Sequence, residues 1–235
     1  MKKLAIIPAY NEEACVENTV REVMRTAPDF DYIVVNDCST DSTERILREN
    51  GFNFISLPVN LGIGGAVQAG YRYALKKNYD MAVQVDADGQ HDPRYLEPMC
   101  EAMEKSGADM VIGSRFIEKE GYQSTRLRRI GINYFTSLIK QMTGVVITDP
   151  TSGLRLSNRR IIREFAEWYP KDFPEPESIV TLLRRGYKVV EVPVRMRERQ
   201  GGKSSINTKA SFYYMIKVTM AILFARFRTR REEEK

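Results

Sequence analysis

Short apolar runs alternate with longer amphipathic segments along the first half of the chain. The runs are rich in β-branched residues and are typical of strands buried on both faces. They predict strands at Leu4–Ile7, Tyr32–Val35, Phe54–Leu57, Met81–Val85 and Met110–Ile112, separated by helices at 15–26, 43–50, 64–77 and 93–105. This alternation predicts an α/β fold, in which helices cover both faces of a mostly parallel central sheet.

After about residue 115 the alternation becomes less regular. Helical patterns at 126–142 and 158–168 flank a polar segment at 148–153, and a strand at Val189–Val194 precedes a Gly-rich basic loop. The 235 residues, 43% of them hydrophobic and 29% charged, suit one large globular domain. We expect this domain at 1–207 and a C-terminal amphipathic helix with a basic tail at 208–235.

The C-terminal segment Ser211–Phe227 is strongly apolar but contains Lys217 and is followed by arginines. It is shorter than the roughly 20 apolar residues that span a bilayer. We therefore expect an interfacial helix, with a basic tail suited to an anionic cytoplasmic leaflet. A helix that packs on the domain or in a dimer is the alternative.

Charge and cysteine content narrow the function classes only slightly. The net charge of +5 and the gathering of Lys and Arg in the second half fit phosphorylated ligands or anionic lipid. The basic residues lack an interleaved aromatic motif, so nucleic-acid binding is not expected. Three cysteines without CxxC spacing favour neither disulfides nor a zinc site, and they fit a reducing cytoplasm. The apolar N-terminus is too short for a signal peptide.

Two carboxylates and an amide follow the predicted strand at 81–85. Asp86 and Asp88 are two residues apart, and Gln90 lies two residues further on. Ligands of open α/β sheets bind beyond the carboxyl ends of the strands. Oxygen ligands at this spacing can hold Mg²⁺ or Mn²⁺, which would neutralise a diphosphate leaving group. A plain polar turn is the alternative, because Asp and Gly favour turns.

Polar motifs follow the other predicted strands as well. The segment 8–13 follows the first strand and 36–41 follows the second, where a nucleoside could stack on an aromatic ring and be hydrogen-bonded. The glycine-rich turn at 60–66 opens a helix whose amide groups suit an anion. Each motif is weak alone, but together they indicate a nucleotide site.

These motifs, in this order, resemble the family 2 glycosyltransferases of the GT-A (Rossmann-like) fold, over essentially the whole chain. Within that family the chain is most similar to the polyprenyl-phosphate (dolichol-phosphate-type) transferases. The motifs that carry this similarity are Asp86-Ala87-Asp88-Gly89-Gln90-His91, Gly113-Ser114-Arg115, Thr151-Ser152-Gly153-Leu154-Arg155 and Val192-Pro193-Val194 before Arg199 and Lys203. The chain departs from the family at Asn36, where an aspartate is usual, and in the spacing to Lys203.

The resemblance implies a role for each motif. The metal would be held by Asp86, Asp88 and Gln90. The nucleotide sugar would be bound by Pro8, Tyr10, Glu12, Val35, Asp37, Asp86, Ala87, Arg199 and Lys203. The acceptor phosphate would be bound by Arg115, Arg129 and Asn133. Asp88 and Arg115 are the expected catalytic residues of a metal-dependent, inverting hexosyltransferase.

The acceptor decides whether a base is needed. A lipid phosphate is already an anion, so it needs positioning and charge shielding, which Arg115 and Arg129 can supply. A glycan hydroxyl would need a base, and Glu177, with Glu175 beside it, is the candidate unless this segment is a proline-stiffened surface loop. His91 is the only histidine. We expect it to pack or hydrogen-bond beside the loop at 86–90 rather than to act as the base. A non-catalytic nucleotide-binding regulatory module is an alternative of another class.

The resemblance also implies partners and a location. The donor would be a nucleotide sugar, for which we favour a uridine nucleotide, and the acceptor an undecaprenyl or dolichyl phosphate used to build cell-surface glycans such as cell wall polysaccharide. The short apolar C-terminal segment resembles that of the family members that work with a separate small membrane protein, which implies such a partner. We therefore expect a cytoplasmic enzyme, peripheral to the inner face of the membrane, and leave open whether it is a monomer or a homo-oligomer.

Overall fold

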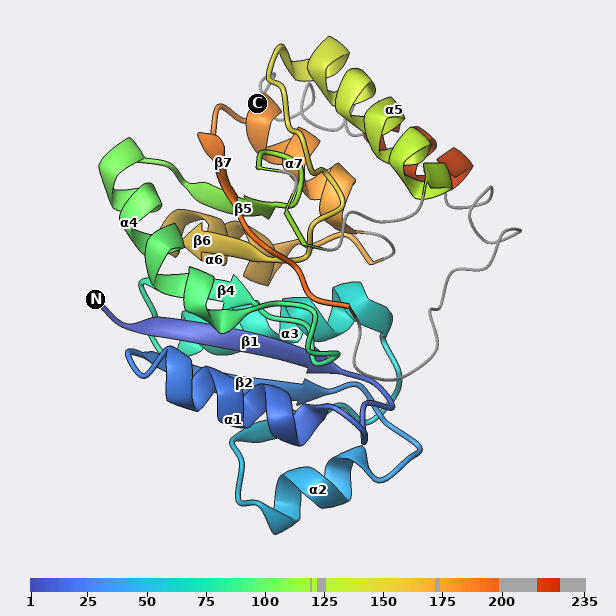
Figure 1. Ribbon diagram of the computed structural model, residues 1–235. Helices are drawn as coiled ribbons and strands as arrows, with labels where there is room; N and C mark the ends of the chain where they lie inside the picture. Colours follow the sequence, from blue (N-terminus) through green and yellow to red (C-terminus); the bar gives the residue numbers. More distant parts are fainter. Residues whose placement is uncertain (119, 122–125, 172–173, 199–214, 225–235) are drawn as a thin grey trace.

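A computed structural model describes residues 1–118, 120–121, 126–171, 174–198 and 215–224 (Figure 1). Its strands are β1 (Lys3–Ala9), β2 (Phe30–Asn36), β3 (Phe54–Ser56), β4 (Met81–Gln84), β5 (Met110–Ser114), β6 (Arg155–Asn158) and β7 (Val189–Pro193). They form one sheet in the order β3-β2-β1-β4-β6-β5-β7. Only the pairings of β6 are antiparallel. The predicted mostly parallel α/β sheet is confirmed.

Helices cover both faces of the sheet (Figure 1). One face carries α1 (Val16–Thr26), α2 (Thr43–Glu49) and α4 (Leu96–Ser106). The other carries α3 (Gly62–Lys76), α5 (Arg126–Thr143), α6 (Arg159–Glu167), α7 (Pro174–Arg184) and a helix at 215–224. Successive strand residues point to opposite faces, so Leu4 and Ile6 join one core while Ala5 and Ile7 join the other. Because both faces of the strands are buried, their sequences are continuous apolar runs.

Every predicted strand and helix within the described residues is present, and two helix ends show the expected capping residues. Gly51 takes the left-handed conformation, with a φ of 63°, just after α2. Asp92 accepts a hydrogen bond from the Arg94 backbone N–H and opens the 3₁₀ turn Pro93–Tyr95 before α4.

Two elements, β6 and α7, are absent from the prediction. The segment that contains Glu175 and Glu177 is not a proline-stiffened surface loop where the structure describes it. Pro174 and Pro176 are buried in the first turn of α7, where the missing N–H of a proline does not interrupt the helix. β6 runs against its neighbours β4 and β5, so it begins at the edge where the parallel strands end. The loop before β6 therefore lies at this edge, together with the loops that follow β1, β2, β4 and β5.

The helix at 215–224 lies beside α5 (Figure 1), and the hydroxyls of Tyr134 and Thr219 are 3.2 Å apart. Val218 and Ile222 are buried in the core, so this part of the predicted C-terminal helix packs on the domain. The rest of the segment 208–235 lies outside the described residues. Among the helices that the structure describes, none is both long enough and apolar enough to cross a membrane.

Candidate active site

The turn that follows β4 carries the predicted metal ligands. Asp88 is nearly buried, with 8% exposed, and its Oδ1 accepts a hydrogen bond from the Gln90 N–H at 3.0 Å. The Ala87 carbonyl accepts the Thr19 hydroxyl at 3.0 Å. Gly89 takes a φ of 75°, which closes the turn. The turn is thus held by Thr19 of α1 and by a hydrogen bond between two of its own residues, Asp88 and Gln90.

Asp86 is held by its neighbours on the same strand end. Its Oδ1 accepts the Gln84 side-chain amide at 2.8 Å, and its N–H donates to His91 Nδ1 at 3.0 Å. Because Nδ1 accepts, the ring proton lies on Nε2, which is 3.6 Å from Asp86 Oδ2. A Cβ on Gly153 would stand 2.9 Å from the same Oδ2. The turn at 86–90 is called the metal turn below. His91 holds it by accepting a hydrogen bond from its backbone, and because Gly153 has no side chain, there is room for the Asp86 carboxylate.

The donor set fits a hard divalent cation. Within the parts of the chain that are described, no three His, Cys, Asp or Glu side chains gather as a metal cluster. Mg²⁺ is commonly bound by one or two carboxylates together with substrate phosphates. Asp86, Asp88 and Gln90 offer only oxygen ligands, which suit Mg²⁺ or Mn²⁺.

The residues expected at the nucleoside converge at the ends of β1 and β2. Pro8 pairs with Val35 in the parallel register, and the Asp37 N–H donates to the Ala9 carbonyl at 2.9 Å. Tyr10, the next residue along, is 48% exposed at this edge. Asp37 itself is buried, and its Oδ1 accepts the Leu61 N–H at 2.7 Å.

The loops after β1 and β2 are tied to each other through several backbone amides. The Asn11 N–H donates to Ser39 Oγ at 3.0 Å, and Asn11 Oδ1 accepts the Thr40 N–H at 2.8 Å. The Glu12 N–H donates to Thr43 Oγ1 at 2.9 Å, and the Glu12 carbonyl accepts from the first turn of α1. These hydrogen bonds join the two loops on which the expected nucleoside-binding residues lie.

Asn36, which departs from the family pattern, has a structural explanation. It is fully buried, and its Nδ2 donates to Glu44 Oε2 at 3.1 Å and to Ser56 Oγ at 2.9 Å, while Oδ1 accepts the Ser39 N–H. An aspartate here would place a second carboxylate against Glu44. The amide is the side chain that suits this neighbour.

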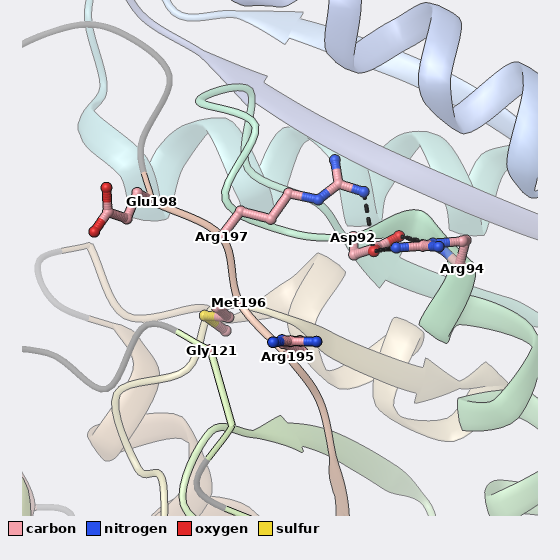
Figure 2. A pocket seen from close by; sticks show the side chains of 7 residues that line it. All are labelled: Asp92, Arg94, Gly121, Arg195, Met196, Arg197 and Glu198. Atoms are coloured by element: carbon pink, nitrogen blue, oxygen red, sulfur yellow. Dashed lines mark hydrogen bonds and ion pairs between the residues drawn. The ribbon is translucent and has the colours of Figure 1, made fainter.

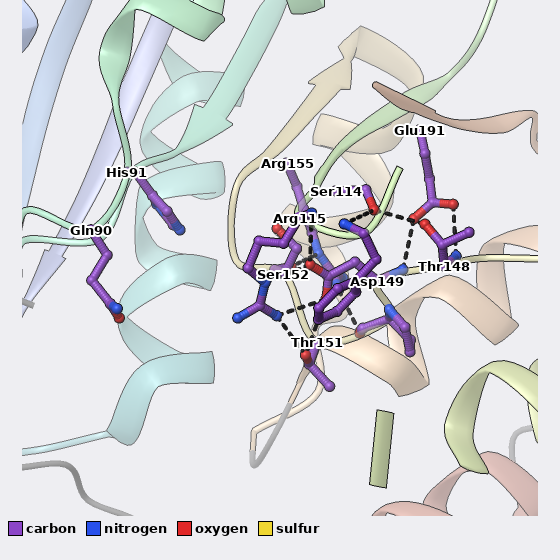
Figure 3. Close-up of polar contacts among 12 residues, drawn as sticks. Gln90, His91, Ser114, Arg115, Thr148, Asp149, Thr151, Ser152, Arg155 and Glu191 are labelled. Carbon is purple, nitrogen blue, oxygen red and sulfur yellow. Dashed lines mark hydrogen bonds and ion pairs between the residues drawn. The ribbon is translucent and has the colours of Figure 1, made fainter. Parts of the chain in front are cut away.

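Arg115 follows β5 and is held by a buried carboxylate (Figure 3). Its Nε and Nη2 donate to Asp149 Oδ2 and Oδ1 at 2.6 and 2.7 Å, and Nη2 also donates to Thr151 Oγ1 at 2.9 Å. Asp149 has no exposed surface. In Figure 3 this cluster lies on one side of the view, and Gln90 and His91 lie on the other.

Arg115 and Arg129 share one aromatic ring. Their guanidinium carbons lie 5.2 and 5.0 Å from the centre of the Phe116 ring. Asn133 is exposed one turn further along α5. The structure thus brings together the two arginines expected at the acceptor phosphate, one from the end of β5 and one from α5.

The two candidate bases have different surroundings. Burial raises the pKa of Glu175 above its usual range, the Asp86 carboxylate adds to this rise, and Arg155 opposes it. Glu177 lines a cavity of about 420 Å³ together with Lys171 and Lys217. Glu175 therefore shares the electrostatic environment of the metal turn, and Glu177 faces α6 and the helix at 215–224.

Arg199 and Lys203 lie outside the described residues, but the chain that leads to them is anchored at the metal turn. The Arg197 N–H donates to the Gln90 carbonyl at 3.0 Å, and its guanidinium binds Glu22 and Asp92 at 2.8 and 2.9 Å. Burial alone would raise the pKa of Asp92, but hydrogen bonds from Arg94 and Arg197 lower it to about 2. Both residues line a cavity of about 560 Å³, and Figure 2 shows the ion pair between them.

Comparison with known proteins settles the family. The model of glycosyl transferase family 2 matches residues 4–165. The chain belongs to this family. It is 32% identical to the undecaprenyl-phosphate mannosyltransferase of Micrococcus luteus, over 97% of this chain and 96% of that one. It is 28% identical to the polyprenol monophosphomannose synthase of Mycolicibacterium smegmatis, over 88% and 81% of the two chains.

The fold of this family 2 glycosyltransferase also matches solved structures. One is the glucosyl-3-phosphoglycerate synthase of Mycobacterium tuberculosis in complex with Mn²⁺, uridine diphosphate and phosphoglyceric acid. The TM-score is 0.70 at 19% identity, over 95% of this chain and 78% of that one. The GT-A fold and the assignment as a glycosyltransferase are confirmed, and the alternative of a non-catalytic module is set aside.

Several residues of the site are missed by sequence reasoning. Asp149 and Gly153 precede the antiparallel strand β6, whereas the candidate residues of an open parallel sheet follow its strands. Glu191 lies inside the predicted strand at 189–194, and Arg197 follows that strand without belonging to a motif. The segment 151–155 carries part of the family resemblance, and it is the sequence signal that points to this loop.

Proposed function

We propose that this glycosyltransferase transfers a sugar from a nucleotide diphosphate to a polyprenyl phosphate, with inversion at the anomeric carbon and with Mg²⁺ or Mn²⁺. The observation that carries the proposal is the pair Arg115 and Arg129 on the Phe116 ring. Two guanidinium groups at one ring suit a phosphate acceptor. The printed names of the relatives in Micrococcus luteus and Mycolicibacterium smegmatis support the same acceptor class.

The donor would bind across the ends of β1, β2 and β4. Tyr10 and the buried Asp37 would hold the nucleoside, and Asp86, Asp88 and Gln90 would hold the metal. The bound ion would neutralise the diphosphate as it leaves. Arg199 and Lys203 are the further residues that we expect at the phosphates.

The acceptor would need no general base, because a lipid phosphate is an anion at neutral pH. The cost of bringing two anions together would be offset by Arg115 and Arg129 on the acceptor side. The guanidinium plane of Arg115 is fixed by the two hydrogen bonds to Asp149, so the entropy of ordering this side chain is lost on folding instead of on binding.

A glycan hydroxyl is the second candidate acceptor. One observation favours it: Glu175 has a raised pKa and is influenced by Asp86, as a base near the reacting centre would be. Sequence reasoning favours Glu177 for this role. Glu175→Gln should abolish transfer to a hydroxyl acceptor and leave transfer to a lipid phosphate within about threefold of wild type.

The location that we propose is the cytoplasmic face of the membrane. Ile216, Met220, Leu223 and Phe224 are exposed on the helix at 215–224, next to the exposed Ile130 of α5. These apolar side chains and the basic sequence that follows suit an anionic lipid surface or a small membrane-protein partner. Fractionation without detergent, with and without residues 208–235, tests this; an unchanged soluble distribution would contradict it.

The central experiment uses a panel of radiolabelled uridine and guanosine diphosphate sugars. Each is incubated with the protein, polyprenyl phosphate, and Mg²⁺ or Mn²⁺, and the products are extracted into organic solvent. We expect one donor to give label in the organic phase, and chelation by EDTA to prevent this. Label that stays aqueous with every donor would reject the lipid acceptor.

A further inference from the structure

The loop at 148–153, here called the bridge loop, connects the two halves of the site. Near its beginning Asp149 binds the Arg115 guanidinium, and at its end Gly153 stands where a Cβ would be 2.9 Å from Asp86 Oδ2. A shift of this loop would therefore move the acceptor arginine relative to the metal turn. The bridge loop thus links the position of Arg115 to that of Asp86.

Glu191 on β7 holds the beginning of the bridge loop (Figure 3). Its Oε2 accepts the Thr148 N–H at 2.7 Å, and its Oε1 accepts the Asp149 N–H at 2.8 Å. Ser114 and Thr148 add a hydroxyl contact at 2.7 Å. Burial of Glu191 raises the pKa of its carboxyl, and both carboxylate oxygens accept hydrogen bonds from the loop.

Arg155 holds the same loop from the core. It is 1% exposed, its Nε donates to the Ser152 carbonyl at 2.7 Å, and its Nη2 donates to the Pro150 carbonyl at 3.1 Å. A buried arginine thus binds loop carbonyls, and a largely buried glutamate binds loop amides. Removing either partner would leave buried polar groups without hydrogen bonds, so both restrain the loop strongly.

We propose that Glu191 is a positioning residue for the acceptor phosphate: it fixes the bridge loop so that Asp149 presents Arg115 at a set distance from Asp86. This inference rests on the proposed function, because it takes the ligand of Arg115 to be the acceptor phosphate. Glu191 itself does not touch the substrate, and it acts through two backbone amides and the Asp149–Arg115 pair.

Glu191→Gln tests the proposal with little change in shape. The amide keeps one acceptor oxygen but turns an NH₂ group toward a backbone N–H, so one of the two hydrogen bonds is lost. We expect the KM for polyprenyl phosphate to rise roughly tenfold. The KM for the nucleotide sugar should stay within about twofold, because the hydrogen bond is lost at the beginning of the bridge loop, while Arg155 still holds its end through the Ser152 carbonyl. An unchanged acceptor KM would overturn the proposal.

Asp109→Asn is the matched control. Asp109 is a buried carboxylate that accepts the Lys188 N–H at 2.9 Å and the Asn158 side-chain amide at 2.9 Å, at the opposite ends of β5 and β7. This variant should lose thermal stability while its acceptor KM stays at the wild-type value. An equal rise of acceptor KM in both variants would show that Glu191 acts only through general stability.

A second measurement separates this proposal from the proposed function. If the wild-type protein makes no lipid-linked product, the proposed acceptor is wrong, and the role of Glu191 is then judged from a crystal structure of Glu191→Gln. We expect a displaced bridge loop and a broken pair between Arg115 and Asp149. Retention of the pair with wild-type distances would overturn the positioning role whatever the acceptor is.

Discussion

The part of the site that we propose for the donor, here called the donor half, and the part that we propose for the acceptor, the acceptor half, are built in different ways. On the donor side, the loops after β1 and β2 are tied to each other by backbone amides and short side chains, such as Asn11 with Ser39 and Thr40. On the acceptor side, Arg115 depends on the buried Asp149, whose loop depends on Glu191. On the donor side the loops are joined by many hydrogen bonds of short polar side chains. On the acceptor side the hydrogen bonds involve a few buried charged groups.

This difference has a physical consequence. Losing one exposed or half-buried hydrogen bond costs about 1 kcal/mol, whereas leaving one partner of a buried ion pair unpaired costs about 3–5 kcal/mol. Single substitutions should therefore be tolerated in the donor loops and not in the acceptor cluster. The metal turn is the exception on the donor side, because we expect substitutions there to lower kcat and not the free energy of unfolding.

The largest expected effect is the loss of transfer in Asp88→Ala. Without this carboxylate the metal loses a ligand, so we expect kcat to fall by at least about 1000-fold, measured as lipid-linked label with saturating Mn²⁺. The loss of the hydrogen bond from the Gln90 N–H should by itself lower the free energy of unfolding by only about 1 kcal/mol, so the variant should remain folded.

Asp31→Ala serves as the control for this variant. Asp31 accepts the Tyr79 hydroxyl at 2.8 Å on β2, near the ends of the strands opposite the metal turn. Its kcat and its response to Mn²⁺ should match wild type. Full activity in Asp88→Ala would overturn the metal assignment and leave Asp86-Ala87-Asp88 as a turn.

The second prediction compares one carboxylate from each half. Asp149→Asn should lower the free energy of unfolding by about 3–5 kcal/mol, because it removes the charge opposite the largely buried Arg115. Asp41→Asn, in a donor loop where Asp41 caps the Thr43 N–H at 2.9 Å, should cost about 1 kcal/mol or less. Urea denaturation measures both, and equal losses would remove the distinction between the two halves.

The sequence predicts the positions of the proposed donor-side residues at the sheet edge, while their roles stay predictions. Each strand from β1 to β4 is a single apolar run, parallel strands end at one edge, and the residues that follow each run are therefore candidates by position alone. Asp86, Asp88, Tyr10 and Asp37 are found in this way. The register that places Pro8 beside Val35 follows from the same parallel topology.

The acceptor half is harder to predict because its contacts join residues that are distant in the chain. Glu191 binds amides more than 40 positions away, at Thr148 and Asp149. β6 is short and contains Arg155 and Ser157, so no apolar run marks it. Its antiparallel direction brings the preceding loop to the functional edge, and local patterns do not reveal strand direction.

The third prediction concerns Gly153, where the two halves meet. A Cβ at this position would stand 2.9 Å from Asp86 Oδ2 and 3.2 Å from Gln84 Nε2, so Gly153→Ala must displace the Asp86 carboxylate. We expect kcat to fall roughly 10- to 100-fold, since small misplacements at a reacting centre are costly. Gly70→Ala, whose Cβ would meet Ile6 in the core at 2.2 Å, should instead lower stability and leave kcat unchanged. Wild-type kcat in Gly153→Ala would show that the metal turn does not depend on the bridge loop.

The smallest effect is expected on the surface beside the acceptor half. Phe224 is 60% exposed and Ile216 is 51% exposed on the helix at 215–224, whereas Val59, 55% exposed, lies on the donor side. If the acceptor side faces lipid, Phe224→Ser should weaken sedimentation with anionic phospholipid vesicles by about fivefold, because less apolar surface leaves water. Val59→Ser should change nothing in the same assay. Equal behaviour of the two variants would mean that lipid does not contact this helix, and a pull-down with a membrane-protein partner would then be expected to depend on Phe224 instead.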